Sequence, residues 1–206
     1  MSQVKKVVID QKILKAAKAC FIRHGFHKAS LRDIAKKANI PLSNLYTYYS
    51  DKNALFVAAL QPVLNDLERL CEFGRTHRRE VSPFETLEEK KEYLRFALDY
   101  IIMHKKELNL LFNQSFGSSL ENYTDYLAQE YEKNWNLFFI DLKKNFPNDK
   151  FNKPSSFFLR NMAHFHFMTI SKILMNDYSL AELKNISDEI STFLWHGGMG
   201  LISGEK

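Results

Sequence analysis

The sequence predicts an all-α fold, and three observations support this. The 206-residue chain contains only seven glycines and five prolines to interrupt helices. No stretch shows the sustained apolar and polar alternation of a half-buried strand between turn signals. Apolar residues instead recur at three- and four-residue spacing, which places them on one face of a helix. Hydrophobic residues make up 45% of the chain and aromatic residues 14%, so a folded core is expected rather than disorder.

Positive charge is concentrated at the N-terminal end of the chain. Residues 1–60 contain 11 Lys and Arg residues against three Asp residues, whereas residues 61–206 contain 18 against 21 acidic residues. A basic module joined to a nearly neutral body is expected to bind a polyanion such as nucleic acid. A basic helix lying on a membrane surface is the competing interpretation. It requires a free apolar face, and the N-terminal helices use theirs for packing.

The chain is expected to be cytoplasmic and to have no membrane partner. It contains no apolar run of membrane-spanning length, and its first residues, MSQVKKVVIDQKIL, carry no secretory cleavage signature. Cys20 and Cys71 are the only cysteines and lie far apart. This pattern indicates neither a disulfide framework nor a zinc site, and it suits a reducing compartment.

Three helices are predicted in the first 50 residues, at 8–24, 31–38 and about 41–48. Gly25 suits a left-handed stop after the first helix. Ser30 occupies the expected N-cap of the second, with Asp33 three residues later as a short form of the capping box. Asn39 tolerates the left-handed conformation that ends the second helix.

The third helix divides into an inner and an outer face. At 100° per residue, Leu42, Leu45 and Tyr49 share the inner face. The outer face is polar and uncharged, with Tyr46 at its flank and the following residues across it: Ser43, Asn44, Thr47 and Tyr48. Two helices joined by a short turn, with a polar second helix, predict a helix-turn-helix that enters the DNA major groove. The alternative is an ordinary three-helix bundle with a solvated polar face.

The run from Ile13 to Leu60 resembles the DNA-binding domain of the tetracycline-repressor (TetR) family. The resemblance rests on ILKAAKACFIRHGFHKASLRDIAKKANI followed by NLYTYYSDKNAL. It covers about the first quarter of the chain, and the later residues resemble the family only in being helical. The sequence departs from the family pattern at Asn39, Pro41 and Ser43–Asn44, so the resemblance does not imply an operator sequence.

The resemblance implies roles for residues in and around the third helix. Tyr46 and Lys52 match the family's phosphate-contacting Tyr and Lys, although Tyr46 is equally expected as a ring that packs at the flank. Other residues fall at positions that reach bases or backbone: Arg32, Ser43, Asn44, Thr47 and Tyr48. Ser30 and Leu42, at the starts of the second and third helices, complete the predicted DNA-binding set.

Residues 61–206 predict a helical body. Pro62 is expected to kink or break a helix that begins after Asp51, and so to mark the junction with the basic module. Further helices are predicted at about 84–104, 106–115, 119–145, 155–176 and 179–202. The predicted domains are residues 1–52, which bind DNA, and residues 53–206.

The body is rich in aromatic residues, and 22 of the 28 aromatic residues lie in it. Most are expected to form core, yet bulky rings leave gaps, and a cavity between helices is a common ligand site. The resemblance implies an effector-binding and dimerisation domain, and the aromatic residues favour a hydrophobic or aromatic effector. The candidate wall residues are Tyr100, His104, Phe112, Tyr126, Trp135 and His166.

No catalytic residues, metal ligands or cofactor are predicted. His164 and His166 lie about 200° apart on a helix and cannot share one ion. The His196-Gly197-Gly198 run lacks the strand and the glycine spacing of a nucleotide-binding loop. The sequence shows no nucleophile elbow and no carboxylate pair with catalytic spacing.

The last two predicted helices are apolar on more than one side, which indicates burial on two sides. Such helices either lie at the centre of a monomer or meet a second subunit, and the resemblance favours a homodimer whose interface is formed by four helices. The expected protein is therefore a ligand-responsive repressor that binds a palindromic double-stranded operator. Its fold is an N-terminal helix-turn-helix three-helix domain followed by a larger helical ligand-binding and dimerisation domain. The alternative is a small-molecule-processing enzyme on a helical scaffold with a basic N-terminal docking arm.

Overall fold

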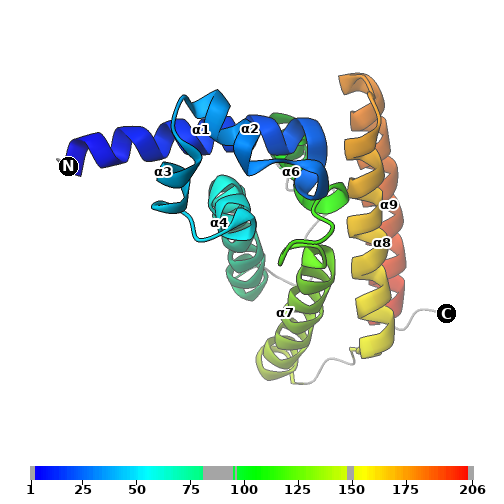
Figure 1. Cartoon of the computed structure of the whole chain (residues 1–206). Helices are drawn as coiled ribbons and strands as arrows, with labels where there is room; N and C mark the ends of the chain where they lie inside the picture. The colour runs from blue at the N-terminus through cyan, green and yellow to red at the C-terminus, as the bar shows by residue number, and fades with distance from the viewer. Residues whose placement is uncertain (1–2, 81–94, 96, 148–150, 204–206) are drawn as a thin grey trace. The chain divides into compact units, whose positions relative to one another are not determined.

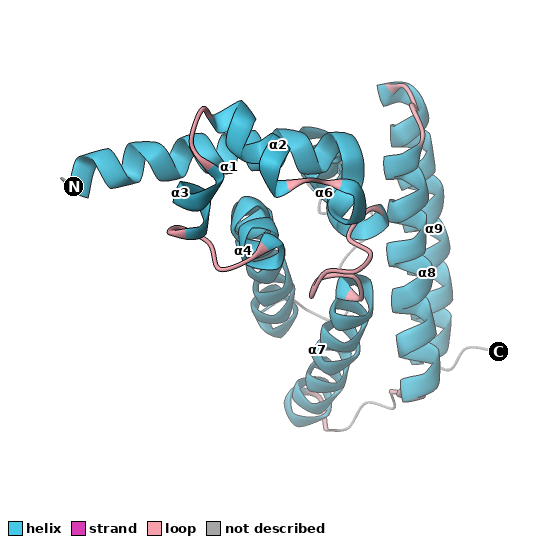
Figure 2. Cartoon of the chain, viewed as in Figure 1, coloured by secondary structure: helices cyan, strands magenta, loops and turns pink. Residues whose placement is uncertain are grey.

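The computed structural model describes residues 3–80, 95, 97–147 and 151–203, and in these ranges it contains helices and loops but no strand (Figure 2). The helices are α1 (Gln3–Lys28), α2 (Leu31–Ala38), α3 (Leu42–Tyr46), α4 (Lys52–Glu80), α6 (Lys105–Asn113), α7 (Tyr123–Asn145), α8 (Ser156–Met175) and α9 (Leu180–Ser203) (Figure 1). Residues 97–103 are also helical. The all-α prediction is confirmed. Most of the predicted helix at 84–104 lies outside the described residues.

The chain forms two compact units that interleave in sequence. The first contains residues 1–66 and 106–123, and the second contains residues 67–105 and 124–206. Helix α6 therefore belongs to the same unit as the N-terminal helices, although 39 residues separate the two parts in sequence. This division follows the packing of the chain. The predicted functional boundary between residues 52 and 53 remains a prediction.

The core of the first unit is built from residues that repeat at helical spacing. Each helix contributes side chains with no exposed surface, including Ile13 and Phe21 from α1, Ile34 from α2, Leu45 from α3, Phe56 from α4 and Leu110 from α6. Phe21 and Phe26 both meet Phe56 edge-on, with ring centroids 4.9 Å apart in each pair. Edge-to-face packing suits the charge distribution of aromatic rings.

Helix α6 and the loop after it attach to the end of α1 and the start of α4. The Phe26 amide donates to the Gln114 carbonyl over 2.9 Å, and the Ser119 amide donates to Asn53 Oδ1 over 2.8 Å. Lys18 and Glu107 form an ion pair between α1 and α6. The packing of α6 is thus reinforced by backbone bonds and a half-buried charge pair.

Gly25 has a positive φ, which the presence of glycine at this position predicted; its φ is 70° and its ψ is 171°. A Cβ at this position would lie 3.3 Å from the Gln114 carbonyl oxygen, which is a close contact with backbone. Two features therefore favour glycine here. The backbone adopts a conformation that other residues rarely adopt, and the end of α6 approaches α1 so closely that a Cβ would be crowded. Asn39 ends α2 in the left-handed conformation, also as predicted.

Of the two outcomes predicted for Pro62, a break does not occur, because α4 continues through it to Glu80, and a kink stays a prediction. A proline removes one amide donor from a helix, which leaves the carbonyl four residues earlier without its partner. Pro62 is exposed, so water can reach that side of the helix. Buried residues on both sides of Pro62, among them Leu60, Val63 and Leu64, hold the helix against core.

The second unit contains α7, α8 and α9, with α8 and α9 running side by side (Figure 1). Ser155 caps α8, because its hydroxyl accepts from the Phe158 amide over 3.2 Å. Arg160 on α8 donates to Glu132 on α7 over 2.8 Å. The buried side chains of this unit include Leu127, Phe139, Leu159 and Leu174. Within the described part of the chain, none of the helices has the length and apolar character needed to cross a membrane.

Candidate nucleic-acid interface

Helix α3 is a five-residue helix whose only buried residue is Leu45. It is joined to α2 by a short turn in which the Ile40 amide donates to the Ala35 carbonyl over 3.0 Å. Pro41 takes the N-cap position. This arrangement is the predicted helix-turn-helix. One buried apolar residue anchors α3, and the other sides of the helix are accessible to a ligand.

The predicted DNA-binding residues differ in exposure. Tyr46 is 51% exposed, and Arg32, Ser43 and Thr47 are also exposed. The remaining predicted residues are half-buried, namely Ser30, Leu42, Asn44, Tyr48 and Lys52. Ser30 occupies the predicted N-cap of α2, but its side chain makes no cap hydrogen bond. The side chains that are free to meet a ligand are therefore concentrated on α3 and on the first turn of α2.

The three tyrosines are not arranged as the helical spacing predicted. Tyr48 was expected to face outward and Tyr49 to lie in the core, but both are half-buried. The reason is that α3 ends at Tyr46, so the 100° increment does not apply to the two residues that follow. Tyr46 is the outward-facing ring of the three.

The end of α3 is closed by contacts between Asn44 and Thr47. The Thr47 hydroxyl donates to the Asn44 carbonyl, and it also lies 3.2 Å from Asn44 Oδ1. The Asn44 carbonyl also accepts from the Thr47 amide over 3.2 Å, so the hydroxyl adds a second donor to a carbonyl of the last turn. These contacts also orient the Asn44 amide at the surface of α3.

Lys52 begins α4, and its ammonium group faces the end of α1. Its Nζ donates to the carbonyls of His27 over 3.1 Å and Ala29 over 3.4 Å. The same nitrogen lies 4.5 Å from the centre of the Phe26 ring. A cation is stabilised by the carbonyls at the end of a helix and by an aromatic face. Lys52 therefore has a structural role in addition to its predicted phosphate contact.

Tyr49 and Asp10 form a hydrogen bond that the sequence did not indicate. The Tyr49 hydroxyl donates to Asp10 Oδ1 over 2.6 Å, joining the segment after α3 to α1. Burial raises the pKa of Tyr49 most, and the hydrogen bond and negative charge of Asp10 raise it further. The hydroxyl is therefore protonated, and it remains a donor at neutral pH.

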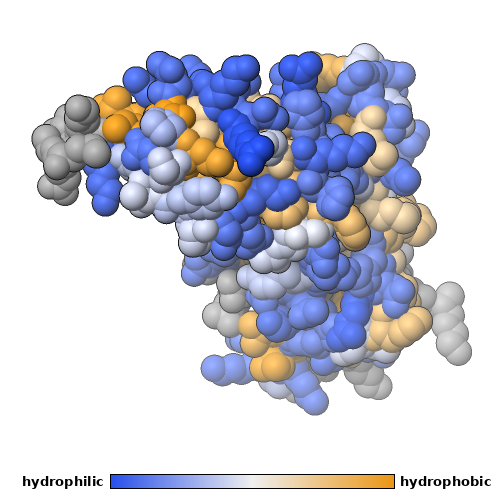
Figure 3. All heavy atoms as spheres, viewed as in Figure 1, coloured by the Kyte–Doolittle hydropathy of each residue, from blue (hydrophilic) through white to orange (hydrophobic). Residues whose placement is uncertain are grey.

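Exposed lysines lie on the two helices that precede α3 in the chain. Lys36 and Lys37 occupy the last turn of α2, and Lys12 and Lys15 lie on α1. On the face drawn in Figure 3, hydrophilic side chains cover most of α1 and α2, and hydrophobic ones show near the N-terminal end of α1. Val7 and Val8 are the exposed apolar residues there. The exposed cations provide the charge that attraction to phosphate requires.

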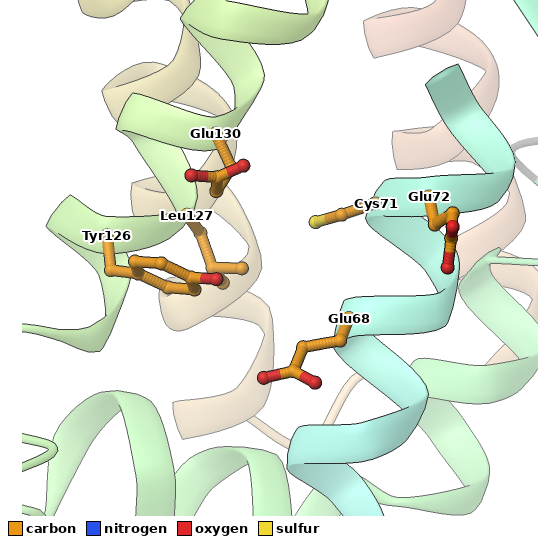
Figure 4. A pocket seen from close by; sticks show the side chains of 6 residues that line it. All are labelled: Glu68, Cys71, Glu72, Tyr126, Leu127 and Glu130. Carbon is orange, nitrogen blue, oxygen red and sulfur yellow. The ribbon is translucent and has the colours of Figure 1, made fainter. Parts of the chain in front are cut away.

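The second unit contains a pocket of about 230 Å³ between α4 and α7. Its lining residues are Glu68, Cys71, Glu72, Tyr126, Leu127 and Glu130. Figure 4 shows Glu68 and Cys71 extending from α4 toward α7, and Tyr126 extending from α7 toward α4. Burial raises the pKa of Tyr126 most, followed by the charges of Glu130 and Glu68. The pocket is thus more acidic than the aromatic composition of the body suggested.

Of the six predicted wall residues, Tyr126 lines this pocket. The rings of Tyr100 and His104 are tilted by 34° with their centres 4.5 Å apart, and Trp135 packs against Phe138 and Phe139. His166 packs edge-on against Phe167, and Phe112 is half-buried. The ligand-binding roles of all six residues, Tyr126 included, remain predictions. Within the described residues, no group of three or more His, Cys, Asp or Glu side chains could hold a metal ion.

Residues 13–59 match the family model "Bacterial regulatory proteins, tetR family". The chain is similar to the HTH-type transcriptional regulator RutR of Escherichia coli K12, with 35% identity over 88 residues. It is also similar to YvdT of Bacillus subtilis 168, an uncharacterised HTH-type transcriptional regulator, with 43% identity over 68 residues. These matches cover 42% and 32% of this chain, and 38% and 34% of the relatives. The chain thus matches well under half the length of these curated relatives.

Solved structures extend the similarity of fold to nearly the whole chain. NalD of Pseudomonas aeruginosa, the secondary repressor of the MexAB-OprM multidrug efflux pump, aligns with a TM-score of 0.66 at 16% identity. That alignment covers 96% of this chain and 98% of NalD. The regulator FadR of Bacillus subtilis, in complex with stearoyl-CoA, aligns with a TM-score of 0.59 at 14% identity over 88% of this chain and 96% of FadR. Residues 13–59 thus match the DNA-binding domain of the TetR family of bacterial regulatory proteins, and nearly the whole chain shares its helical fold with regulators such as NalD and FadR.

Proposed function

We propose that this chain is a sequence-specific DNA-binding transcriptional regulator that acts as a ligand-responsive repressor. The observation that carries the proposal is the TetR-type domain at residues 13–59, in which α3 is fixed by buried Leu45 and presents polar residues outward. A helix of this kind fits the major groove, where hydroxyl and amide groups pair with base edges. The exposed lysines of α1 and α2 supply attraction to the phosphates, and a cytoplasmic location is part of the proposal.

The relatives support a regulator over the alternative enzyme. RutR, NalD and the probable acrEF/envCD operon repressor of Escherichia coli K12 are named as regulators or repressors. The last of these is 34% identical to the chain over 110 residues. The proposed DNA contacts are those predicted from the sequence, with Arg32, Ser43, Tyr46 and Thr47 the most accessible of them.

The protein is proposed to act as a homodimer through α8 and α9. Phe157 on α8 is 79% exposed and Phe193 on α9 is 62% exposed. Phe165 and Phe193 lie 6.3 Å apart between ring centres, so exposed rings of α8 and α9 meet at this pair. Hydrophobic patches are visible along α8 in Figure 3. A second copy of the same two helices is the occupant that would bury these rings and match a palindromic operator.

The effector is proposed to bind in the second unit, in the pocket that contains Tyr126. The aromatic content of the body favours an apolar or aromatic ligand, whereas Glu68 and Glu130 favour a positive charge. An aromatic amine satisfies both requirements, because a ring can pack on Tyr126 and an ammonium group can meet the carboxylates. The stearoyl-CoA in the FadR structure shows that a protein of similar fold binds a ligand, but it does not identify the effector of this chain.

The proposal is tested by selecting DNA from random duplexes with the purified protein and sequencing the bound fraction. A palindromic consensus with half-sites about one or two helical turns apart is the expected result for a dimeric helix-turn-helix protein. A binding titration with the consensus and a scrambled duplex of equal length then gives the specificity ratio. Equal affinity for the two duplexes would contradict sequence-specific regulation.

A further inference from the structure

Asp10 is an acidic residue whose place in a basic domain needs a physical reason. Only three acidic residues occur in the first 60. Asp33 lies in the first turn of α2, where a negative charge is favourable. Asp51 caps α4, because its Oδ1 accepts from the Ala54 amide over 2.7 Å. Asp10 lies in the interior of α1, and its described contact is the Tyr49 hydroxyl.

The contact matters because α3 is too short to be stable without tertiary support. A helix of five residues gains few internal hydrogen bonds. Its start is tied to α2 through Ile40 and Ala35, and its middle is held by Leu45. Beyond its last residue, the side-chain bond from Tyr49 to Asp10 ties the chain to α1. Rotation of α3 about its buried leucine is opposed by this bond.

Base recognition depends on orientation more strongly than phosphate binding does. A contact with a base edge requires a hydrogen-bond distance and direction, whereas phosphate attraction tolerates displacement. A small rotation of α3 would therefore move Ser43, Asn44 and Thr47 away from base edges and leave general attraction to DNA intact.

We propose that Asp10 is a positioning residue for DNA recognition, which sets the orientation of α3 through Tyr49 without touching the DNA. The inference rests on the proposed function. It assigns to Asp10 a contribution to sequence discrimination, separate from any contribution to the stability of the fold. The group required at residue 10 is a hydrogen-bond acceptor, and its negative charge is not required.

The experiment compares Asp10→Ala, Asp10→Asn and Tyr49→Phe with the wild-type protein on the selected consensus and on a scrambled duplex. Asp10→Ala and Tyr49→Phe should each lower the ratio of specific to non-specific affinity by about tenfold, the size of one lost base contact. Asp10→Asn keeps an oxygen that accepts from Tyr49, so its ratio should stay within about twofold of wild type. Tyr178→Phe, at an exposed tyrosine of the second unit, is the matched control and should leave the ratio unchanged.

Unfolding measurements on the same variants separate positioning from stability. A purely structural Asp10 would lower the unfolding midpoint of Asp10→Ala and leave the specificity ratio of the folded protein unchanged, which overturns the inference. Equal losses in Asp10→Asn and Asp10→Ala would show that charge is what matters, and this also overturns it. If the wild-type protein itself fails to discriminate, the proposed function fails and the inference fails with it. If the wild-type protein discriminates and every variant keeps the same specificity ratio, only the inference about Asp10 fails and the proposed function stands.

Discussion

Lys52 illustrates how one side chain can serve both the fold and a ligand. Its ammonium group has three N–H donors, and two of them are directed at the His27 and Ala29 carbonyls. The same nitrogen lies 4.5 Å from the centre of the Phe26 ring, and a contact between its third N–H and a phosphate oxygen stays a prediction. The residue that the family resemblance assigns to phosphate is thus held through its ammonium group at the end of α1.

Replacing Lys52 with alanine should weaken binding to all DNA sequences alike. The slope of log affinity against log salt should decrease by about one, the effect of losing one phosphate contact. The free energy of unfolding should also fall by about 1 kcal/mol, because two carbonyls lose a charged donor. Binding titrations at several salt concentrations and denaturant unfolding measure both effects. Lys143→Ala, at an exposed position of α7, is the control, and an unchanged salt slope in Lys52→Ala would contradict the phosphate contact.

Asn44→Ala should act on sequence preference instead. Asn44 lies on the outer side of α3 and is oriented by Thr47, so its loss removes a group suited to base edges. The difference in binding free energy between consensus and scrambled DNA should narrow by about 1–3 kcal/mol. The same titrations measure this difference in binding free energy. If Asn44→Ala showed the same difference as the wild-type protein, Asn44 would not contact a base.

Tyr49 should make the stability of the domain sensitive to alkaline pH. Its pKa in the folded protein is raised above the ordinary value of 10.0, so its contribution is fully present below pH 10 and declines as pH rises further. The difference in unfolding free energy between wild type and Tyr49→Phe should therefore shrink above that pH. Denaturant unfolding at neutral pH and at several values above 10 checks the direction, and a difference that grew with pH would contradict it.

The sequence predicted the inner position of Leu45 and the left-handed conformation of Asn39. It did not predict the hydrogen bond between Tyr49 and Asp10, because that bond depends on the angle between α1 and the segment after α3. The early end of α3 likewise follows from tertiary packing and not from the spacing of its tyrosines.

At the scale of helices, the join between α1 and α6 depends on Gly25. Gly25→Ala should destabilise the protein by about 1–3 kcal/mol, because alanine is strained at positive φ and its Cβ would press on the Gln114 carbonyl. Gly117→Ala is a matched comparison, since Gly117 also has positive φ (82°) but its nearest neighbours are 3.9 Å away. Thermal or denaturant unfolding should show a larger loss for Gly25→Ala. Equal losses would mean that the contact with Gln114 adds nothing.

The exposed rings of α8 and α9 give a prediction about assembly. Phe193→Glu should convert a dimer to a folded monomer, because Phe193 is mostly exposed within one chain and its replacement leaves the core intact. Sedimentation measures the mass and circular dichroism the helix content. Ile140→Glu, at a residue of α7 that is 61% exposed, should leave the mass unchanged. A wild-type protein that sediments as a folded monomer at micromolar concentration would contradict the proposed dimer.

The helices themselves were largely predictable, and their errors have physical causes. Spacing and capping residues placed α2, α8 and α9 to within a residue or two. Pro62 does not break α4, because it lies on an exposed side of the helix, where water can reach the carbonyl four residues earlier. The membership of α6 in the first unit could not be predicted, since its apolar residues show that it is packed but not against which partner.

At the scale of the molecule, α4 is the element that both compact units share. It begins in the first unit and continues through Pro62 into the second, where its later residues line the pocket. A ligand in that pocket therefore contacts the same continuous helix that carries Lys52. The ligand can alter DNA binding only if it binds the DNA-competent and the DNA-incompetent conformations of the protein with different affinities.

Ligand and operator should therefore weaken each other's binding by the same factor, with a coupling of about 1–3 kcal/mol. Benzylamine, which is cationic at neutral pH, serves as the probe, and benzyl alcohol is its neutral counterpart of similar size. Benzylamine should bind the protein alone more tightly than benzyl alcohol, and Glu68→Gln should reduce the difference. Calorimetric titrations with and without operator measure the coupling. Binding of benzylamine with identical affinity in both titrations would contradict the switch.

The discontinuous first unit also limits how this protein can be taken apart. A fragment that ends at residue 66 would expose the surface that Leu108, Leu110 and Leu111 cover, and it would leave the Phe26 amide without the Gln114 carbonyl. An exchange of operator specificity between two such regulators therefore cannot be made with a single crossover after the N-terminal helices. The transplanted part has to include residues 106–123 from the same parent, inserted as a second segment. A chimera built from one contiguous piece would join surfaces that were never selected to fit each other.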